Sequence, residues 1–296
     1  DDPQAAALFF HPDGTPLAAG QTLRNPALAA VLRAVASQGA DVFYRGEIAH
    51  DIVARVRGHA RNPGLLAEAD LAGYRAIERE PLCFTHRRWR LCGMPPPSSG
   101  ALAVGQMLGM LETLGIEALR PRPAPWGLEP DVQAVHLFSE AGRLAFADRA
   151  RYVADPDFAP LPGLGAATLL DAEYLKQRAS LIGPRSMGHA AAGKPLGPQM
   201  SLADDHSPEL ASTTQVSVVD GFGHALAMTS TIENGFGAQI MVRGFLLNNQ
   251  LTDFSFLPEV DGLPVANRVQ PGKRPRSSMA PLLVFDRDSG AFEMAL

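Results

Sequence analysis

The sequence lacks a long apolar run, has almost no cysteine and carries little excess charge. The best candidate for a membrane span, residues 101–116, is interrupted by glycines and by Glu112, so a transmembrane helix is not expected. Only 2 of the 296 residues are cysteine, which is too few for a disulfide-rich scaffold or a four-cysteine zinc site. A formal net charge of −5 argues against a protein that binds nucleic acid by neutralising phosphates.

Familiar catalytic signatures are also missing. There is no HExxH, P-loop, GxGxxG or GxSxG motif, and the eight histidines show no metal-ligand spacing. We therefore expect neither a cofactor nor a metal ion.

Apolar residues make up 46% of the chain, enough for a large core, and the length permits one large domain or two smaller ones. The chain begins with Asp1 rather than methionine and ends in the apolar stretch 292–296. We expect it to be the middle of a longer precursor.

Helical patterns predominate before residue 212. Asn25 followed by Pro26 predicts a helix start, and Gly39 predicts its end. The apolar face of this helix would comprise Leu28, Val31, Leu32 and Val35. Further helices are expected over residues 48–56, 65–74, 101–114, 131–152 and 168–181.

Two of these helices carry more specific expectations. The prolines and serines of residues 95–99 predict a rigid turn that supplies a serine cap to the helix over 101–114. In the helix over 131–152, Leu137, Leu144 and Phe146 are core candidates.

Strand patterns predominate after a Gly-, Pro- and Ser-rich loop predicted over residues 183–212. Strands are expected over residues 216–219, 225–232, 244–249, 282–285 and 291–296. Residues 81–94 predict an earlier hairpin that turns at residues 87–88, which sets Cys83 opposite Cys92. These cysteines form either a disulfide or two buried thiols. The pattern predicts an α+β fold with largely antiparallel sheets.

Three polar clusters remain as candidates for chemistry: residues 212–214, residues 229–237, and residues 248–254 together with 273–279. Each has a purely structural interpretation as a strand opening, a strand end or a turn. In the functional interpretation of the first cluster, a threonine hydroxyl attacks the carbonyl that precedes it and an ester forms. Water then releases a new N-terminal threonine, whose α-amine of pKa about 7.7–8.0 can act as base. In the third cluster, amides, hydroxyls and a carboxylate suit a zwitterionic amino acid.

Taken together, these motifs resemble the γ-glutamyltranspeptidase family of N-terminal-nucleophile hydrolases. The matching stretches are residues 95–100, 147–149, 155–158, 213–220, 229–233, 246–255 and 273–279. The resemblance implies a four-layer αββα sandwich. It also implies a precursor that cleaves itself into a large-subunit portion, residues 1–212, and a small-subunit portion, residues 213–296, which form one intertwined domain.

The resemblance also implies roles for single residues. Thr213 would be the nucleophile that carries the γ-glutamyl ester, and Thr231 would assist it by hydrogen bonding. Gln250 and Asp253, helped by Glu233, would bind the α-ammonium of the donor. Its α-carboxylate would be bound by Ser277 and Ser278.

The sequence departs from the family pattern in several places. Gln215 replaces a histidine often found there, Glu233 stands where many members have asparagine, and the connection from Phe254 to Ser277 is short of the loop that covers the site in some members. The glycine-rich segment that forms the oxyanion hole and the arginine that binds the donor carboxylate are expected beyond the two ends of this chain.

The expected donor is glutathione or another γ-glutamyl compound, and the acceptor is water, an amino acid or a dipeptide. The resemblance further implies a pair of subunits after processing, leaves a homo-oligomer open, and indicates a periplasmic or secreted location. Two alternatives stay open: an amidase similar to cephalosporin (glutaryl) acylases on the same fold, and a catalytically inert homologue that binds ligands.

Overall fold

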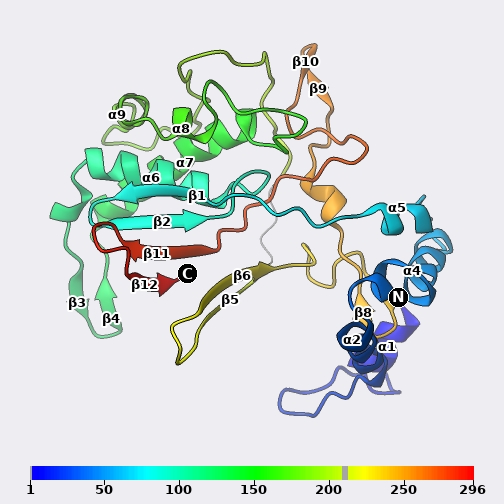
Figure 1. Cartoon of the computed structure of the whole chain (residues 1–296). Helices are drawn as coiled ribbons and strands as arrows, with labels where there is room; N and C mark the ends of the chain where they lie inside the picture. Colours follow the sequence, from blue (N-terminus) through cyan, green and yellow to red (C-terminus); the bar gives the residue numbers. More distant parts are fainter. Residues whose placement is uncertain (1, 209–212) are drawn as a thin grey trace. The chain divides into compact units, whose positions relative to one another are not determined.

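The computed structural model describes residues 2–208 and 213–296 of the chain (Figure 1). Their contacts divide these residues into two compact units. Unit 1 comprises residues 2–78, 213 and 231–249, and unit 2 comprises residues 79–208, 214–230 and 250–296. Each unit therefore combines segments that lie far apart in the sequence.

Unit 1 is built from helices and one short β-hairpin. Its helix α2 begins as predicted, because Asn25 Oδ1 accepts from the N–H of Leu28 at 2.9 Å, and it ends at Gly39. Leu32 is 59% exposed, so its predicted place on the buried face is wrong. The buried core comprises Val31, Ile48, Ile52, Ile240 and Val242. The elements of unit 1 are α1 (Pro3–Phe9), α2 (Pro26–Gln38), α3 (Asp41–Tyr44), α4 (Glu47–Arg57), α5 (Glu68–Gly73), β7 (Met241–Val242) and β8 (Phe245–Leu246).

The turn between β7 and β8 packs against the start of α2. Asn25 Nδ2 donates to the carbonyl of Gly244 at 2.7 Å, and a Cβ on Gly244 would lie only 2.3 Å from Asn25 Oδ1. Gly244 also has a φ of +85°, which a residue with a side chain rarely adopts. The strand predicted over residues 244–249 is limited to Phe245–Leu246, and the turn and its contact to α2 account for the loss of Gly244 from its start.

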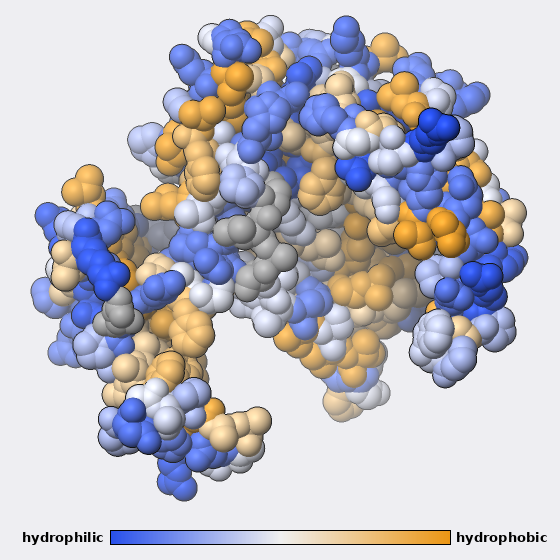
Figure 2. Space-filling model, turned by 180° about the vertical axis from the view of Figure 1, so that it is seen from behind, coloured by the Kyte–Doolittle hydropathy of each residue, from blue (hydrophilic) through white to orange (hydrophobic). Residues whose placement is uncertain are grey.

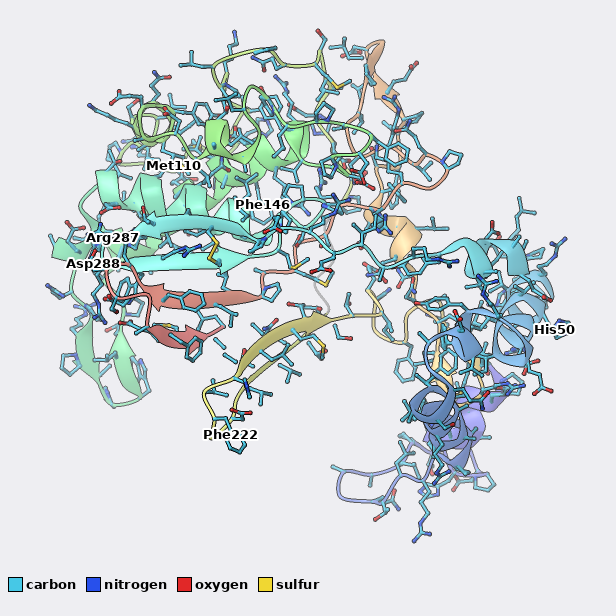
Figure 3. The ribbon with its side chains drawn as sticks, in the orientation of Figure 1. His50, Met110, Phe146, Phe222, Arg287 and Asp288 are labelled. Atoms are coloured by element: carbon cyan, nitrogen blue, oxygen red, sulfur yellow. A yellow bond between two sulfur atoms is a disulfide. The ribbon has the colours of Figure 1, made fainter. Side chains whose placement is uncertain are left out.

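Unit 2 centres on a four-stranded antiparallel sheet in the order β1-β2-β11-β12. The hairpin of β1 and β2 pairs Cys83 with Cys92 as predicted, and the two form a disulfide (Figure 3). The hairpin of β11 and β12 is also confirmed, and Leu283 of β11 lies beside Cys92. The strands of the sheet are β1 (Leu82–His86), β2 (Trp89–Gly93), β11 (Leu282–Asp286) and β12 (Phe292–Ala295).

One face of this sheet packs on helices and the other faces the hairpin of β5 and β6. Phe84 of β1 approaches Gly105 of α6, while Cys83, on the opposite face, lines a cavity together with Ala227 of β6. Helix, sheet and second β-layer are three layers of the predicted αββα order, and the predicted α+β class with antiparallel sheets is confirmed. The remaining elements of unit 2 are α6 (Gly100–Thr113), η1 (Ile116–Ala118), β3 (Arg122–Ala124), β4 (Gly127–Glu129), α7 (Val132–Tyr152), α8 (Ala166–Leu169), α9 (Ala172–Ala179), β5 (Thr214–Val219), β6 (Ala225–Ser230), η2 (Gln250–Asp253), β9 (Glu259–Val260) and β10 (Leu263–Pro264).

Two helical predictions for this unit need correction. Phe146 of α7 is 44% exposed, whereas Leu137 and Leu144 are buried as expected. The single helix predicted over residues 168–181 is two helices, because Asp171 ends the first stretch and caps α9 by accepting from the N–H of Tyr174 at 3.0 Å.

The long loop before β5 is fastened to α7 by buried acidic side chains. Within residues 183–208 the structure contains no helix or named strand, as predicted. Asp148 accepts from the N–H of Gly193 at 2.8 Å and pairs with Arg178 at 3.1 Å, while Glu140 accepts from the N–H of Met187 at 2.8 Å. Buried backbone groups of a loop need such partners, so this segment is held in a defined path.

Apolar side chains lie among polar ones on the face of the molecule shown in Figure 2. On the hairpin of β5 and β6, Val216, Val218 and Leu226 are exposed, and Phe222 at its turn is 90% exposed (Figure 3). None of the helices formed by residues 2–208 and 213–296 has the length and apolar character of a membrane span.

Asn25→Ala removes both the cap of α2 and the bond from this helix to the turn at Gly244. We expect the free energy of unfolding to fall by about 1–2 kcal/mol, because a cap and a second hydrogen bond are lost together. Urea unfolding followed by circular dichroism measures this change. Asn62→Ala, which changes an exposed asparagine of the same unit, is the control and should stay within about 0.5 kcal/mol of wild type. Equal losses in the two variants would contradict the assignment.

Candidate active site

The hairpin of β5 and β6 has Thr213 and Thr231 at one end. Thr214 pairs with Ser230, and its Oγ1 donates to the carbonyl of Ser230 at 2.7 Å. Thr213 directly precedes β5 and Thr231 directly follows β6, so both threonines adjoin the last pair of this ladder. Thr213 is exposed and Thr231 is half-buried. Ser212, the other residue of the predicted cleavage bond, lies outside the described residues.

Glu233 is held in the turn that follows Thr231. Its N–H donates to Thr231 Oγ1 at 2.8 Å, and its carboxylate accepts from Asn249 Nδ2. The residue is 7% exposed and has a φ of +71°, a left-handed conformation that asparagine adopts more readily than glutamate. The turn thus has a backbone shape that suits asparagine, but places a buried carboxylate there.

Gln215 replaces the histidine expected two residues after Thr213, and its amide joins neighbouring strands. Gln215 Nε2 donates to the carbonyl of Leu296 at 3.0 Å, and its Oε1 accepts from the hydroxyl of Thr229. The first strand after Thr213 is therefore fixed on both sides by this one side chain.

Gln250 and Asp253 form the two ends of the 3₁₀ helix η2 in unit 2. Their side chains face each other, with Gln250 Nε2 at 3.4 Å from Asp253 Oδ2, and both residues are half-buried. The backbone carbonyl of Asp253 accepts from Asn267 Nδ2 at 2.7 Å. An amide and a carboxylate are thus presented side by side, as the binding of an ammonium group requires.

Ser277 and Ser278 lie on a segment that runs beside the start of α6. Ser277 accepts at its carbonyl from the N–H of Ser99 at 2.9 Å and donates its own N–H to the carbonyl of Pro97 at 3.2 Å. Ser99 occupies the N-cap position of α6, but its side chain makes no cap bond, so the predicted serine cap is wrong. Its Oγ donates instead to the carbonyl of Ser277 at 2.7 Å. Two motifs from distant parts of the sequence meet here.

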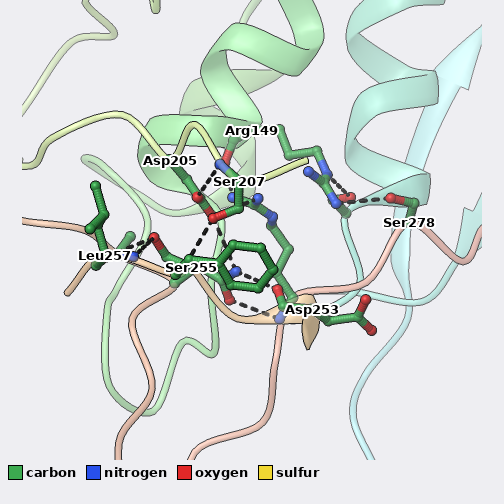
Figure 4. A network of polar contacts seen from close by, with 12 residues as sticks. Arg149, Asp205, Ser207, Asp253, Ser255, Leu257 and Ser278 are labelled. Carbon is green, nitrogen blue, oxygen red and sulfur yellow. Dashed lines mark hydrogen bonds and ion pairs between the residues drawn. The ribbon is translucent and has the colours of Figure 1, made fainter. Parts of the chain in front are cut away.

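A buried ion pair lies beside the segment that carries Asp253 and the segment that carries Ser277 and Ser278 (Figure 4). Arg276 Nη2 lies 3.0 Å from Asp205 Oδ2, and the two side chains are 3% and 0% exposed. Asn267 is fully buried, accepts from the N–H of Arg276 at 3.0 Å, and donates from Nδ2 to Asp205 at 3.3 Å as well as to Asp253. The segments that carry Asp253 and Ser278 are thus attached to one buried group.

The electrostatics of Asp205 follow from this pairing. Burial on its own would raise the pKa of Asp205, but the Arg276 guanidinium and the hydrogen bonds from Ser207 and Asn267 hold that pKa below its usual range. The carboxylate is therefore charged at neutral pH. Removal of only one partner would leave a buried charge without its counterion.

The segment before Arg276 is held from the other side by a second buried carboxylate. Asp155, which is fully buried, accepts from the N–H of Arg274 at 2.9 Å and from Arg79 Nη2 at 3.3 Å. Lys273 is also buried, donates to the carbonyl of Ala266, and lies with Nζ 5.8 Å from the centre of the Phe158 ring. Burial and the nearby Arg268 lower the pKa of Lys273 to about 8.

Sequence reasoning missed the two residues that organise this region, Asp205 and Asn267. Asp205 lies in a polar run of a loop, where acidic residues are usually solvated, and Asn267 lies in a stretch with turn composition. No local pattern distinguishes them. Arg149 and Asp155 belong to motifs that match the family, but no role could be predicted for either from the sequence. Within residues 2–208 and 213–296, no three His, Cys, Asp or Glu side chains cluster so as to hold a metal ion.

A family model described as gamma-glutamyltranspeptidase matches residues 1–296. The chain is 36% identical over 283 residues to the glutathione hydrolase proenzyme of Escherichia coli (strain K12), a match that covers 93% of this chain and 45% of that protein. It is also 36% identical over 297 residues to the acylase ACY 1 proenzyme of Pseudomonas sp. (strain SE83), covering 100% of this chain and 48% of that protein.

The fold has solved counterparts. A crystal structure of cephalosporin acylase from Bacillus halodurans superposes with a TM-score of 0.75 at 26% identity, covering 99% of this chain and 48% of that one. The chain thus spans about half the length of the curated relatives and of the solved structure it matches.

Asp205→Asn tests the buried ion pair. We expect the free energy of unfolding at pH 7 to fall by about 3–5 kcal/mol, because the Arg276 cation loses its carboxylate. The contribution of Asp205 is present above its unfolded pKa of about 3.9 and is lost as pH falls through its lowered folded pKa. The gap between wild type and variant should therefore narrow below pH 4, as urea unfolding at a series of pH values measures.

The neighbouring Asp204 supplies the control for this experiment. It pairs with Arg151 at 2.6 Å, and the side chains are 24% and 33% exposed. Asp204→Asn should cost no more than about 1 kcal/mol, because partly exposed pairs contribute little. A gap between wild type and Asp205→Asn that is constant with pH would contradict the predicted role of this ion pair.

Proposed function

Because the chain belongs to the γ-glutamyltranspeptidase family, we propose that the protein cleaves its own chain between Ser212 and Thr213 and then uses Thr213 to transfer or hydrolyse γ-glutamyl groups. The observation that carries this proposal is the register of β5 and β6, whose last pair is Thr214 with Ser230, so that Thr213 and Thr231 directly adjoin the end of this ladder. A nucleophile and a second hydroxyl within reach of it are what such chemistry needs.

The proposed chemistry uses one oxygen twice. Thr213 Oγ attacks the carbonyl carbon of Ser212, the peptide nitrogen leaves, and an ester forms. Water hydrolyses this ester and leaves a carboxylate on Ser212 and a free α-amine on Thr213. This amine then accepts the proton of the same hydroxyl as the oxygen attacks the γ-carbonyl of a donor, whose amide nitrogen departs with a proton. Water or an acceptor amine resolves the second ester.

We propose that the α-ammonium and the α-carboxylate of the donor are bound by two different sets of residues. Asp253 and Glu233 are carboxylates and Gln250 is an amide acceptor, and each of these groups suits an α-ammonium. Ser277 and Ser278 suit an α-carboxylate through hydroxyl donors. Glutathione, which carries both groups on its γ-glutamyl end, is the donor we propose, as for the Escherichia coli relative named glutathione hydrolase.

A glutaryl amidase is the second candidate. The match to an acylase over the whole chain and the likeness to a cephalosporin acylase structure favour it. A glutaryl group has the same terminal carboxylate as a γ-glutamyl group but no ammonium. The buried carboxylate of Glu233 and the carboxylate of Asp253 would then have no cation of the substrate to bind, which favours the γ-glutamyl donor.

We further propose that residues 1–212 and 213–296 belong to the two subunits produced by processing, which remain intertwined. The names of both curated relatives describe proenzymes. A periplasmic or secreted location is part of the same proposal. The disulfide of Cys83 with Cys92 supports it, because such bonds persist in oxidising compartments.

Thr213→Ala should abolish both chain cleavage and turnover. The variant lacks the attacking oxygen, so intact mass and N-terminal sequencing of the full-length protein after incubation should show one uncut chain. Release of p-nitroaniline from γ-glutamyl-p-nitroanilide should fall by at least about 10³-fold. Wild type should show a new N-terminus at Thr213.

Thr214→Ala is the matched control for this change. It removes the hydroxyl bond to Ser230, at an expected cost of about 1 kcal/mol, but leaves Thr213 in place. The variant should still be cut before Thr213. If Thr214→Ala abolishes cleavage and Thr213→Ala does not, the nucleophile is Thr214 and not Thr213. A wild-type chain that binds donors without cleaving them would indicate an inert homologue.

Donor preference separates the two candidate activities. Wild type should turn over γ-glutamyl-p-nitroanilide with a higher kcat/KM than glutaryl-7-aminocephalosporanic acid, because only the first carries an ammonium for Asp253 and Glu233. Asp253→Asn should reduce kcat/KM for the γ-glutamyl donor about tenfold or more and change the glutaryl donor little. A preference for the glutaryl donor in wild type would reverse the assignment.

A further inference from the structure

Arg149 of α7 is a buried cation that contacts Ser278 and Ser99. The residue is 4% exposed. Its Nη2 donates to Ser278 Oγ at 2.8 Å (Figure 4), and its Nε donates to Ser99 Oγ at 2.6 Å. One guanidinium thus binds hydroxyls from two segments that lie far apart in the sequence.

The second of these hydroxyls extends the contact to Ser277. Ser99 Oγ accepts from Arg149 and donates to the carbonyl of Ser277 at 2.7 Å, while the N–H of Ser99 donates to the same carbonyl at 2.9 Å. Arg149 therefore reaches Ser278 directly and Ser277 through Ser99. The planar fork of an arginine suits such a two-directional contact, which a lysine cannot reproduce.

Ser278 is exposed, although the Arg149 guanidinium that donates to its hydroxyl belongs to a buried residue. A hydroxyl oxygen that accepts from a cation has a more polarised O–H bond and becomes a stronger donor. A carboxylate that accepts from Ser278 would also lie one hydroxyl away from a positive charge in a region of low dielectric.

We propose that Arg149 is a positioning residue for the donor α-carboxylate: it orients and polarises the Ser278 hydroxyl, and fixes Ser277 through Ser99. This inference rests on the proposed function, because it presupposes that the serine pair binds a carboxylate. Arg149 itself does not touch the donor. It sets selectivity for a substrate that carries an α-carboxylate.

Three donors isolate this effect. γ-Glutamyl-p-nitroanilide carries both the α-carboxylate and the α-ammonium, 4-aminobutyryl-p-nitroanilide is the same group without the carboxylate, and glutaryl-p-nitroanilide is the same group without the ammonium. The experiment measures kcat/KM for each donor on the full-length protein, with rates normalised to the processed fraction from intact mass.

In Arg149→Met, the ratio of kcat/KM for the γ-glutamyl donor to that for the 4-aminobutyryl donor should fall about tenfold or more, mainly through KM. The ratio of the γ-glutamyl to the glutaryl donor should stay within about twofold, because both carry the carboxylate. Arg149→Lys should lie between wild type and Arg149→Met. Ser99→Ala, a milder change, should lower the first ratio about threefold and carries the test if Arg149→Met fails to process.

Arg143→Met is the matched control, since Arg143 lies on the same helix, is exposed and pairs with Glu140. Its ratios should equal those of wild type. Equal falls for all three donors in the Arg149 and Ser99 variants would show a purely structural role and overturn the inference alone. A wild-type protein that releases p-nitroaniline from none of the donors would overturn the proposed function and the inference with it.

Discussion

The ion pair between Asp205 and Arg276 is the interaction on which the arrangement of the loops in unit 2 depends. Both side chains are buried, so each charge needs the other and the hydrogen bonds that Asn267 and Ser207 add. Asn267 connects this ion pair to the carbonyl of Asp253. Arg276 itself directly precedes Ser277 and Ser278 in the chain. Loops without regular structure are thereby given the rigidity that a binding site requires.

In this region the charged side chains are mostly buried, and the groups nearer the solvent are mostly uncharged. The buried layer contains charged groups that pair with one another, as Arg276 does with Asp205, and buried Asp155 pairs with the half-buried Arg79. The layer nearer the solvent contains hydroxyls, amides and the half-buried carboxylate of Asp253. A ligand that reaches this layer meets short polar groups whose positions are set by long charged ones beneath them, which limits how far they can move to accommodate another shape.

Periodicity and turn chemistry in the sequence were sufficient for elements whose signals are local. The cap at Asn25, the hairpin that pairs Cys83 with Cys92, and the helix ending at Tyr152 all depend on neighbouring residues, and all are found. The predictions that Phe146 is buried and that Ser99 caps its helix are wrong, because both depend on tertiary contacts. Phe146 lies on an exposed part of α7, and Ser99 binds Ser277 instead of its own helix. The adjacency of β2 and β11, about 190 residues apart, leaves no local trace in either strand. For the candidate site, the sequence supplied the residues through family motifs, but not Asp205 or Asn267, whose importance arises only from burial.

The pairing of β5 has a consequence for the chain end that a cut before Thr213 would create. Six residues of β5 are paired with β6, and Gln215 joins them to Leu296. A new terminus in most proteins frays, because nothing holds its first residues. Here the terminal residue would adjoin an already paired strand. The conformational entropy of this residue is therefore reduced before any substrate binds. The amine and hydroxyl of Thr213 would thus lie directly beside the last pair of a hydrogen-bonded ladder.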